Sequence, residues 1–376
     1  MSNFSYWERK YFWDESDFIV VGGGITGLTT AWFLKQAAPK SSVKVLERGV
    51  LPSGASTKNA GFACFGSMSE ILSDITSDGE DAVFSLIDMR LSGLARLRTL
   101  LGDAGIGYEP CGGYEIFTGE GEERYRECKN ALDLINRRMA PLTGKHTFRN
   151  ADADAAKFGF GGVRHMIRNS AEGLIDTGLM MRSLTAKVRN AGADILNGVT
   201  VTGTEADHSG VRVYTDCGEL KAGRVCIAVN GFAQKLLPDL DVKPCRAQVI
   251  VTEPIAKLQV KGAFHHNCGY DYFRHLDGRI LLGGGRNLDS DAETTDDFGT
   301  TAIIQDYLDR FLREIILPGR AVKTAMRYSG IMGIGSSKKL IIEKVAPNLV
   351  CAVRFGGMGV ALGTAAGNTA AELLTE

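Results

Sequence analysis

Hydrophobic and polar positions near the start of the chain predict a strand, a helix and a second strand in succession. Residues 18–21 form a continuous apolar run rich in β-branched side chains, which is typical of a strand buried on both faces of a parallel sheet. From residue 25 the apolar positions recur with helical spacing and fall on one face: Ile25, Leu28, Trp32 and Phe33. Residues 43–46 predict the next strand. Residues 17–48 therefore have the pattern of a βαβ unit.

Three glycines mark the turn between the first strand and the helix. Gly22, Gly24 and Gly27 have the spacing G-x-G-x-x-G. The first permits a tight turn, the second lets the backbone approach a pyrophosphate, and the third lets helix and strand pack closely. Glu47 ends the second strand 20 residues after Gly27, where a carboxylate can accept hydrogen bonds from ribose hydroxyls. The combination predicts a dinucleotide site at the positive end of the helix.

The rest of the chain mixes helical and strand patterns. Helices are predicted over residues 82–101, 122–139, 177–191 and 300–316, with a last one that ends near Leu374. Strands are predicted over residues 112–117, 193–201, 211–214, 218–221, 224–229, 246–251, 269–274, 279–286, 323–330, 340–344 and 348–353. Residues 1–16 are aromatic and charged, and we expect an arm packed across the edge of the sheet.

Composition and charge exclude several classes of function. The 376 residues suffice for two domains, and 43 basic against 44 acidic residues give no indication of nucleic-acid binding. The first residues lack the apolar core of a signal peptide, and no apolar run approaches the roughly 20 residues that span a bilayer. Eight scattered cysteines without a C-x-x-C pair indicate reduced thiols. We therefore expect a cytoplasmic protein without a transmembrane segment.

A group of histidines and a cysteine raises the question of a metal. The residues concerned are His265, His266, Cys268 and His275, and their spacing matches no familiar ligand set. We predict no metal site.

A second short motif carries a resemblance to a known family. Residues 54–61 have the sequence G-A-S-T-K-N-A-G and follow both the glycine fingerprint and the pair Glu47-Arg48. This arrangement resembles the FAD-dependent D-amino-acid oxidase superfamily, which includes glycine oxidase, sarcosine oxidase and D-amino-acid dehydrogenases. In that family the segment lies over the pyrophosphate and the flavin. Lys58 replaces the usual arginine. The resemblance implies FAD, since spacing alone does not separate FAD from NAD.

Further segments match the family. Val201 corresponds to a residue whose backbone faces the adenine, and Asn230 stands in a turn near the cofactor where a small residue is commoner. Residues 354–363 resemble the closing motif, whose helix N-terminus suits the negative charge of reduced flavin. The resemblance implies cofactor contacts at Gly22, Gly24, Ile25, Thr26, Gly27, Glu47, Arg48, Ala55, Ser56, Asn59, Ala60, Gly61, Val201, Ala228, Asn230, Gly231, Arg354, Gly356, Gly357, Met358, Gly359 and Val360.

The resemblance covers nearly the whole chain and implies an α/β fold. A Rossmann-like FAD-binding domain is expected from residues 1–67, 151–235 and 325–376. Residues 68–150 and 236–324 are expected to form an inserted α+β substrate domain with a mixed or antiparallel sheet.

The implied activity is oxidation of an amine or amino acid. A hydride would pass from the carbon that bears nitrogen to flavin N5, and the imine would then hydrolyse. The electron acceptor is left open between oxygen and a carrier such as a quinone, and the oligomeric state is also open. Sarcosine oxidases carry a flavin-linked cysteine near the positions of Ala325 and Met326, so we expect non-covalent FAD.

Two departures concern the substrate. Family members often hold a carboxylate with an arginine, but residues 330–333 contain none, and Met358 replaces a histidine often seen over the flavin. The candidate substrate and catalytic residues are Tyr270, Arg274, Arg286, Arg327 and Met358, with Arg354 as a further carboxylate partner because guanidinium binds carboxylate in a bidentate manner.

Two alternatives remain open. The same fold could oxidise a 2-hydroxy acid, or the chain could bind flavin or a partner without catalysis. A nicotinamide dehydrogenase is disfavoured by residues 54–61.

Overall fold

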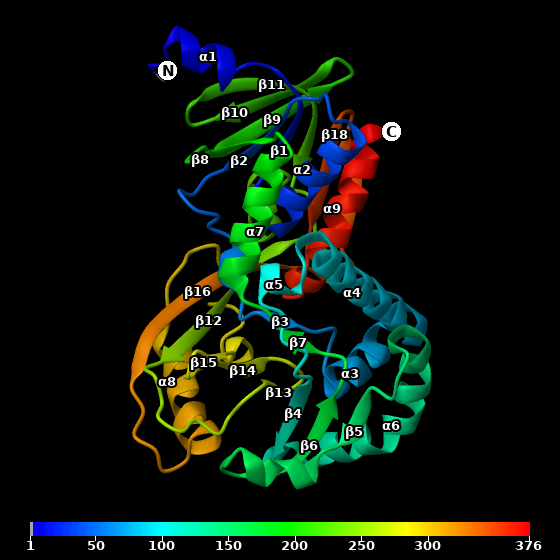
Figure 1. The fold of residues 1–376 in the computed structure, drawn as a ribbon, viewed down its shortest axis with the longest axis vertical. Coiled ribbons are helices and arrows are strands. Elements are labelled where there is room, and N and C mark those ends of the chain that lie inside the picture. The colour runs from blue at the N-terminus through cyan, green and yellow to red at the C-terminus, as the bar shows by residue number, and fades with distance from the viewer. Residues whose placement is uncertain (1–2) are drawn as a thin grey trace.

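The computed structural model describes residues 3–376 and contains two eight-stranded sheets and one two-stranded sheet. The helices are α1 Tyr6–Tyr11, α2 Ile25–Ala37, α3 Met68–Asp78, α4 Glu80–Leu101, α5 Asp103–Ile106, α6 Glu122–Thr143, α7 Thr177–Asn190, α8 Ala302–Phe311 and α9 Gly359–Thr375. The strands are β1 Ser16–Val21, β2 Val43–Glu47, β3 Phe62–Ala63, β4 Gly113–Thr118, β5 Phe148–Asn150, β6 Val163–Asn169, β7 Gly173–Leu174, β8 Asp194–Asn197, β9 Val201–Asp207, β10 Gly210–Thr215, β11 Gly218–Ile227, β12 Lys243–Thr252, β13 Ala263–His266, β14 Asp271–Leu276, β15 Arg279–Gly283, β16 Thr324–Ile334, β17 Ile341–Ala346 and β18 Leu349–Val353. The two large sheets occupy opposite ends of the molecule in Figure 1.

The first sheet has the order β17-β18-β11-β1-β2-β8, and β9 and β10 extend from β11. Strand β1 pairs in parallel with β2 and β11, so that Val21 lies beside Leu46 on one side and Ile227 on the other. The apolar run at residues 18–21 is buried, as a central parallel strand requires. Because these strands are parallel, their carboxyl ends meet at one edge of the sheet, which faces the second sheet.

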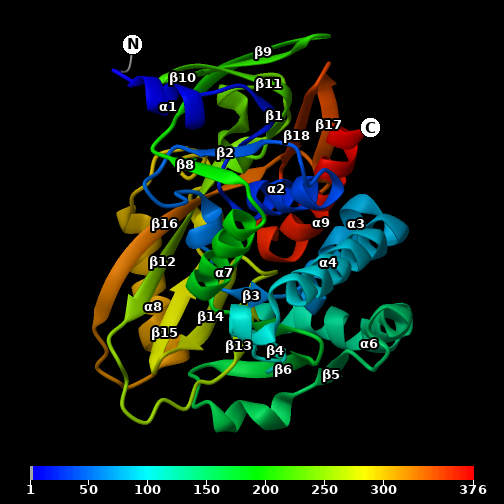
Figure 2. The ribbon, with the colours of Figure 1, turned by 45° about the horizontal axis from the view of Figure 1, so that its top comes forward.

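Helices α2 and α9 pack side by side on this first sheet (Figure 2). A Cβ at Gly367 of α9 would lie 2.1 Å from Thr29 Oγ1 of α2, and one at Gly27 would lie 1.9 Å from the Gly22 carbonyl oxygen. The glycines therefore allow a helix–helix and a helix–strand approach that a larger residue would block. Segments from near the two ends of the chain are brought together in this way.

The second sheet has the order β16-β12-β15-β14-β13-β4-β6-β5 and is mixed, because β13 and β4 are parallel while the other neighbouring pairs are antiparallel. One face packs against α8, where Phe264, Phe273 and Leu308 share a buried cluster. The α/β fold class with a mixed second sheet is confirmed.

Several boundaries differ from the predictions. Strands β6 and β16 belong to the second sheet, whereas the predicted division at 151 and 325 placed them in the cofactor domain. The predicted strand 193–201 is broken between β8 and β9, where Gly198 has a φ of 75°. In the N-terminal arm, Trp13 Nε1 donates to the Glu219 carbonyl oxygen at 3.0 Å, but Tyr6 and Trp7 of α1 remain exposed.

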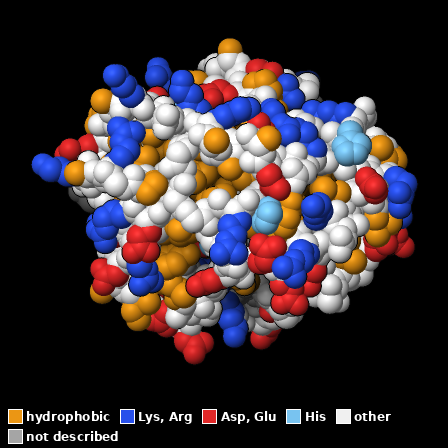
Figure 3. Space-filling view, turned by 90° about the horizontal axis from the view of Figure 1, so that it is seen from below, with side chains coloured by type: hydrophobic (Ala, Val, Ile, Leu, Met, Phe, Trp, Pro, Cys, Tyr) orange, Lys and Arg blue, Asp and Glu red, His pale blue; other side chains and the backbone are white. Residues whose placement is uncertain are grey.

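Figure 3 shows the face of the molecule seen from below in the view of Figure 1, on which positive and negative side chains are interspersed. No helix within residues 3–376 is both long enough and apolar enough to cross a bilayer.

Candidate cofactor and substrate site

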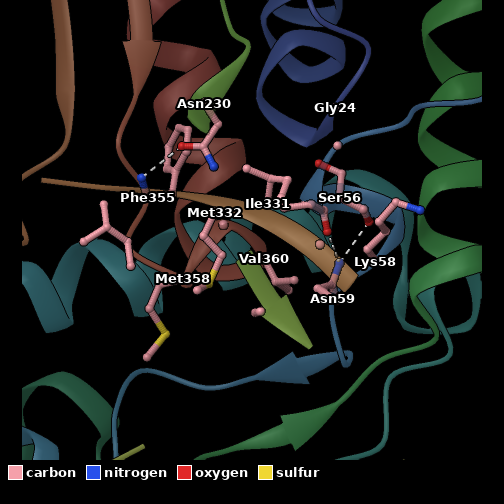
Figure 4. A pocket seen from close by; sticks show the side chains of 18 of the residues that line it. Gly24, Ser56, Lys58, Asn59, Asn230, Ile331, Met332, Phe355, Met358 and Val360 are labelled. Carbon is pink, nitrogen blue, oxygen red and sulfur yellow. Dashed lines mark hydrogen bonds between the residues drawn. The ribbon is translucent and has the colours of Figure 1, made fainter. Parts of the chain in front are cut away.

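A cavity of about 680 Å³ lies between the carboxyl edge of the first sheet and the inner face of the second. Its walls come from segments far apart in sequence: the turn before α2, residues 53–60, the end of β11, strand β16 and the start of α9 (Figure 4). Most of the predicted residues line it, namely Gly22, Gly24, Ile25, Thr26, Glu47, Arg48, Ala55, Ser56, Asn59, Ala60, Val201, Ala228, Asn230, Tyr270, Arg286, Gly356, Gly357, Met358, Gly359 and Val360. The remaining six do not: Gly27, Gly61, Gly231, Arg274, Arg327 and Arg354.

The N-terminus of α2 opens on the cavity. Its N-cap, Gly24, makes no side-chain cap, and the first turn contains no acidic residue. Ser56 Oγ accepts the Ile25 N–H at 2.9 Å, and a Cβ at Gly24 would lie only 2.8 Å from that hydroxyl. Gly22 has a φ of 110°, and a Cβ there would lie 2.6 Å from the Ala228 carbonyl oxygen. This end of α2 therefore combines glycine backbone, the Ser56 hydroxyl and a positive dipole end, which suits a pyrophosphate.

Glu47 is buried and oriented by backbone donors. Oε1 accepts from the Gly49 N–H at 2.9 Å, the Ser53 N–H at 3.2 Å and the Ser53 hydroxyl at 2.9 Å. Within residues 3–376, Oε2 accepts only from the Gly23 N–H, at 2.9 Å. Since an ionised carboxylate oxygen offers about two lone-pair sites, Oε2 keeps one for a ligand in the cavity. That is the geometry a ribose hydroxyl requires.

The loop of residues 54–61 is held mainly by Asn59. Its amide donates to the Ser56 carbonyl at 2.9 Å, and its Oδ1 accepts from the Gly61 N–H at 2.9 Å and from Thr177 Oγ1 at 2.8 Å. Lys58, which replaces the family arginine, places its ammonium 5.3 Å from the Phe298 ring centroid. Asn59 therefore fixes the conformation of the loop. Together with the small residues around it, Asn59 lines the cavity.

The start of α9 forms the opposite wall of the cavity. Asn230 has a φ of 46°, and its Oδ1 accepts the N–H groups of Arg354 at 3.1 Å and Phe355 at 3.4 Å (Figure 4). The N-cap Met358 makes no side-chain cap, and nothing lies within 4 Å of a Cβ placed at Gly356. A second helix N-terminus therefore meets the same cavity, over open backbone where a flat ring system would fit.

Tyr270 and Arg286 line the cavity on the side of the second sheet. The Arg286 guanidinium lies 5.5 Å from the Tyr270 ring centroid, within the range of a cation–π contact, and Tyr270 is 42% exposed. Nearby, burial raises the pKa of Tyr272, whose hydroxyl therefore stays protonated. Val249 and Met332 add an apolar surface between these polar groups.

Three predicted arginines have other partners. Arg274 donates to the carbonyls of Ile175 at 2.7 Å and Gly61 at 3.1 Å, and burial lowers its pKa. Arg327 is paired with Asp309 at 2.8 Å. Arg354 is paired with Asp241 at 2.7 Å. Each stabilises contacts between segments outside the cavity. The structure therefore differs from the prediction that these guanidinium groups are available to a substrate.

The two predicted glycines that neither line the cavity nor pack α2 act in close packing. A Cβ at Gly61 would lie 2.4 Å from the Ile175 carbonyl oxygen, and one at Gly231 would lie 2.4 Å from the Met332 carbonyl oxygen. Glycine at these two positions therefore allows a close approach of the backbone segments behind the cavity.

Sequence reasoning missed a group of ionisable residues at the far end of the cavity. Glu70 and Asp74 lie on α3, and Lys338 reaches them from the loop after β16, at 3.0 Å from Glu70 Oε1 and 2.8 Å from Asp74 Oδ1. His265 on β13 lines the same end, and its partner is the buried Glu172. The i, i+4 spacing of Glu70 and Asp74 is visible in the sequence. The pairing of Lys338 with Asp74, 264 residues apart, and of His265 with Glu172, 93 residues apart, is visible only in the structure.

Comparisons with known proteins place the chain in a family. A family model described as FAD dependent oxidoreductase (DAO) matches residues 17–373. The chain belongs to this family. Its members use FAD, so the predicted superfamily, the cofactor and an oxidoreductase activity are confirmed. The N-termini of α2 and α9, whose N-cap residues make no side-chain cap, and the carboxylate of Glu47 at the cavity wall fit that cofactor.

Individual relatives of this oxidoreductase are distant. A curated protein from Rhizobium meliloti (strain 1021), "Probable oxidoreductase OrdL", is 24% identical over an alignment of 374 residues that covers 96% of this chain and 83% of that protein. The fold is similar to glycine oxidase from Geobacillus kaustophilus, with a TM-score of 0.77 at 18% identity over 96% of this chain and 95% of that one. It is also similar to L-proline dehydrogenase from P. horikoshii, with a TM-score of 0.75 at 18% identity over 96% and 94% of the two chains.

Proposed function

We propose that this oxidoreductase oxidises the C–N bond of an amine or amino acid. When bound, FAD would supply the acceptor for a hydride from the carbon that bears nitrogen, and the resulting imine would be hydrolysed by water. The observation that carries the proposal is a single cavity in which the N-termini of α2 and α9 meet a wall of mixed polar and apolar residues from the second sheet. The names of the structural neighbours, an amino-acid oxidase and a dehydrogenase, agree with this substrate class.

The chain's own residues would hold FAD without a covalent bond. The turn before α2 and Ser56 would bind the pyrophosphate, Glu47 the ribose, and the backbone of Val201 the adenine. Residues 356–360 would cover the ring system, and the positive end of α9 would favour negative charge there. Met326 lies in the region where sarcosine oxidases link their flavin, and it is 57% exposed on β16.

Substrate binding is assigned to Tyr270 and Arg286. Arg286 could receive a substrate carboxylate, and Tyr270 would lie against the same group, while Val249 and Met332 would contact the carbon chain. Such a wall positions the reacting carbon, which is the main requirement of hydride transfer. Oxygen or a carrier would take up the electrons afterwards.

The proposal is tested by mixing the FAD-bound protein anaerobically with a panel of amines, amino acids and 2-hydroxy acids. We expect at least one amine or amino acid to bleach the visible absorbance of the flavin, and admission of air or a quinone to restore it. Bleaching by 2-hydroxy acids alone would refute the proposed substrate class. A preparation whose flavin is reduced by dithionite but by no member of the panel would indicate binding without catalysis.

A further inference from the structure

The second-sheet wall of the cavity contains an imidazole with a buried carboxylate behind it. His265 Nε2 lies 3.0 Å from Glu172 Oε2, and the two side chains are 8% and 1% exposed. His265 lines the cavity. Glu172 engages Nε2, and among residues 3–376 no hydrogen bond engages Nδ1. Nδ1 is therefore the nitrogen available to a molecule in the cavity.

The strand pattern of β13 explains why this imidazole faces inward. Successive side chains point to opposite faces of a strand, and Phe264 is buried in the cluster shared with α8. His265 consequently lies on the cavity face, beside Tyr272 of β14 and Glu115 of β4. The Phe62 ring packs edge-on against the imidazole, with centroids 5.1 Å apart. The ring is thus held on several sides.

Glu172 depends on a glycine and on His265. A Cβ at Gly113 of β4 would lie 2.1 Å from Glu172 Oε2, so only a glycine leaves room for the carboxylate. Its other oxygen, Oε1, is buried and has no hydrogen-bond partner in the part of the chain that the structure describes. A buried carboxylate is costly unless it is paired, so the N–H on Nε2 is strongly favoured. This hydrogen bond fixes the tautomer in which Nδ1 carries the lone pair.

The surrounding charges make His265 more basic than usual. Burial acts to lower the pKa of His265, but the carboxylates of Glu172, Glu115 and Glu70 act in the opposite direction and prevail, so the pKa lies above its ordinary value. Two cations, Arg90 and Lys338, face Glu70 from the other side. A base of this strength, in its unprotonated form, is suited to accepting a proton from an alkylammonium group.

We propose that His265, oriented by Glu172, is the base that accepts the proton which a substrate ammonium must lose before its hydride can leave. This inference rests on the proposed amine oxidation. The N–H bond of R2CH–NH3+ breaks, its proton binds the Nδ1 lone pair, and the neutral amine keeps the electron pair. When bound, FAD would supply the acceptor for the hydride, and the electron pair on nitrogen would then form the C=N bond. His265 would later release its proton to water.

Other polar groups along the cavity are less suited to this step. Lys338 is engaged by Glu70 and Asp74. Burial raises the pKa of Tyr272, so its hydroxyl is not a base at neutral pH. Arg286 is a permanent cation. His265 combines a lone pair, a carboxylate partner and contact with the cavity.

The first test follows the rate constant of anaerobic flavin reduction by a reactive amine from about pH 6 to about pH 10, a range that spans the ordinary pKa values of histidine and an alkylammonium group. We expect His265→Asn to lower this rate constant about 100-fold near neutral pH. Above the pKa of His265 the loss should shrink about tenfold per pH unit, and it should vanish where the amine is itself neutral. His266→Asn is the matched control, because His266 is paired with Asp271 at 3.0 Å and does not line the cavity; its profile should match the wild type.

The second test does not depend on activity. Nitrogen chemical shifts of 15N-labelled histidine in the FAD-bound protein report tautomer and pKa, and His265→Asn identifies the signal. In the neutral imidazole, measured above the pKa of His265, we expect a proton on Nε2 and none on Nδ1, and the pKa should fall in Glu172→Gln. A neutral form with its proton on Nδ1, or a pKa that Glu172→Gln leaves unchanged, overturns the inference.

The two proposals fail in different ways. If no amine reduces the flavin, the proposed function is wrong, and the NMR titration still decides whether His265 has the tautomer of the base. If amines reduce it and His265→Asn retains the wild-type pH profile, amine oxidation stands and only the role of His265 is refuted.

Discussion

Replacement of Glu47 by glutamine would separate the structural role of this carboxylate from its role in cofactor binding. Both oxygens accept hydrogen bonds in the structure, three at Oε1 and one at Oε2. An amide has only one oxygen, so the favoured rotamer keeps it at Oε1 and turns the NH2 group toward the Gly23 N–H. That N–H is then left without an acceptor, whether or not FAD is bound.

The magnitudes follow from this geometry. An unsatisfied buried N–H costs about 1–3 kcal/mol, so the free energy of unfolding of the apoprotein should fall by that amount. Loss of a charged acceptor for the ribose removes about 1.5–3 kcal/mol of binding, which raises the Kd for FAD roughly 10- to 100-fold. Denaturant unfolding of the apoprotein and titration of FAD by calorimetry measure the two effects separately.

The control is Glu343→Gln, at an exposed position on β17 of the same sheet. Both quantities should be unchanged in this variant. If Glu47→Gln loses stability but binds FAD as tightly as the wild type, Glu47 shapes only the loop of residues 49–53. The assignment of the ribose to this carboxylate would then be refuted.

Three further perturbations test other parts of the structure. Gly27→Ala introduces a Cβ 1.9 Å from a backbone oxygen and should lower the free energy of unfolding by about 1–3 kcal/mol. Gly54→Ala should leave the free energy of unfolding unchanged, because no described atom lies within 4 Å of the new Cβ. Equal melting temperatures of the two variants in calorimetry would contradict this expectation. Glu293 is 1% exposed, and although burial acts to raise its pKa, its arginine partner and neighbouring donors lower the pKa below 4.5. Glu293→Gln should therefore lower the free energy of unfolding by about 3–5 kcal/mol at neutral pH, and this difference should shrink as the pH falls through the lowered pKa. A difference that does not change with pH in acid titrations of unfolding would be evidence against a charged Glu293. Arg286→Met should raise KM for a carboxylate substrate about 10- to 100-fold with little change in kcat, while Arg327→Met should leave KM unchanged; the reverse pattern in steady-state kinetics would exchange their roles.

Local patterns in the sequence predict most of the residues that line the cavity at the edge of the first sheet. The run at residues 18–21, the glycines and Glu47 lie within about thirty residues of one another, and their geometry is set by a strand, a turn and a helix that pack on each other. The α/β fold class and FAD followed from these residues and from the family resemblance. The geometry of this side of the cavity depends mainly on backbone conformation, which the spacing of the glycines indicates.

The substrate side could not be predicted to the same depth. The chemistry of guanidinium predicts carboxylate binding for Arg274, Arg327 and Arg354. Whether each guanidinium is available depends on carbonyls and carboxylates contributed by distant segments. The pairing of His265 with Glu172 spans 93 residues and requires the parallel alignment of β13 with β4. Only the three-dimensional arrangement of the second sheet shows which polar side chains face the cavity.

The interlocking of α2 with α9 has a consequence for biosynthesis. The first half of the nucleotide fingerprint leaves the ribosome more than three hundred residues before the helix that must pack against it. Until α9 is synthesised, the face of α2 that contains Thr29 has no helix to pack against. The nascent chain therefore lacks a complete cavity for FAD. FAD is therefore expected to bind only after synthesis is finished. Before that point, folding intermediates should be protected by chaperones rather than by FAD.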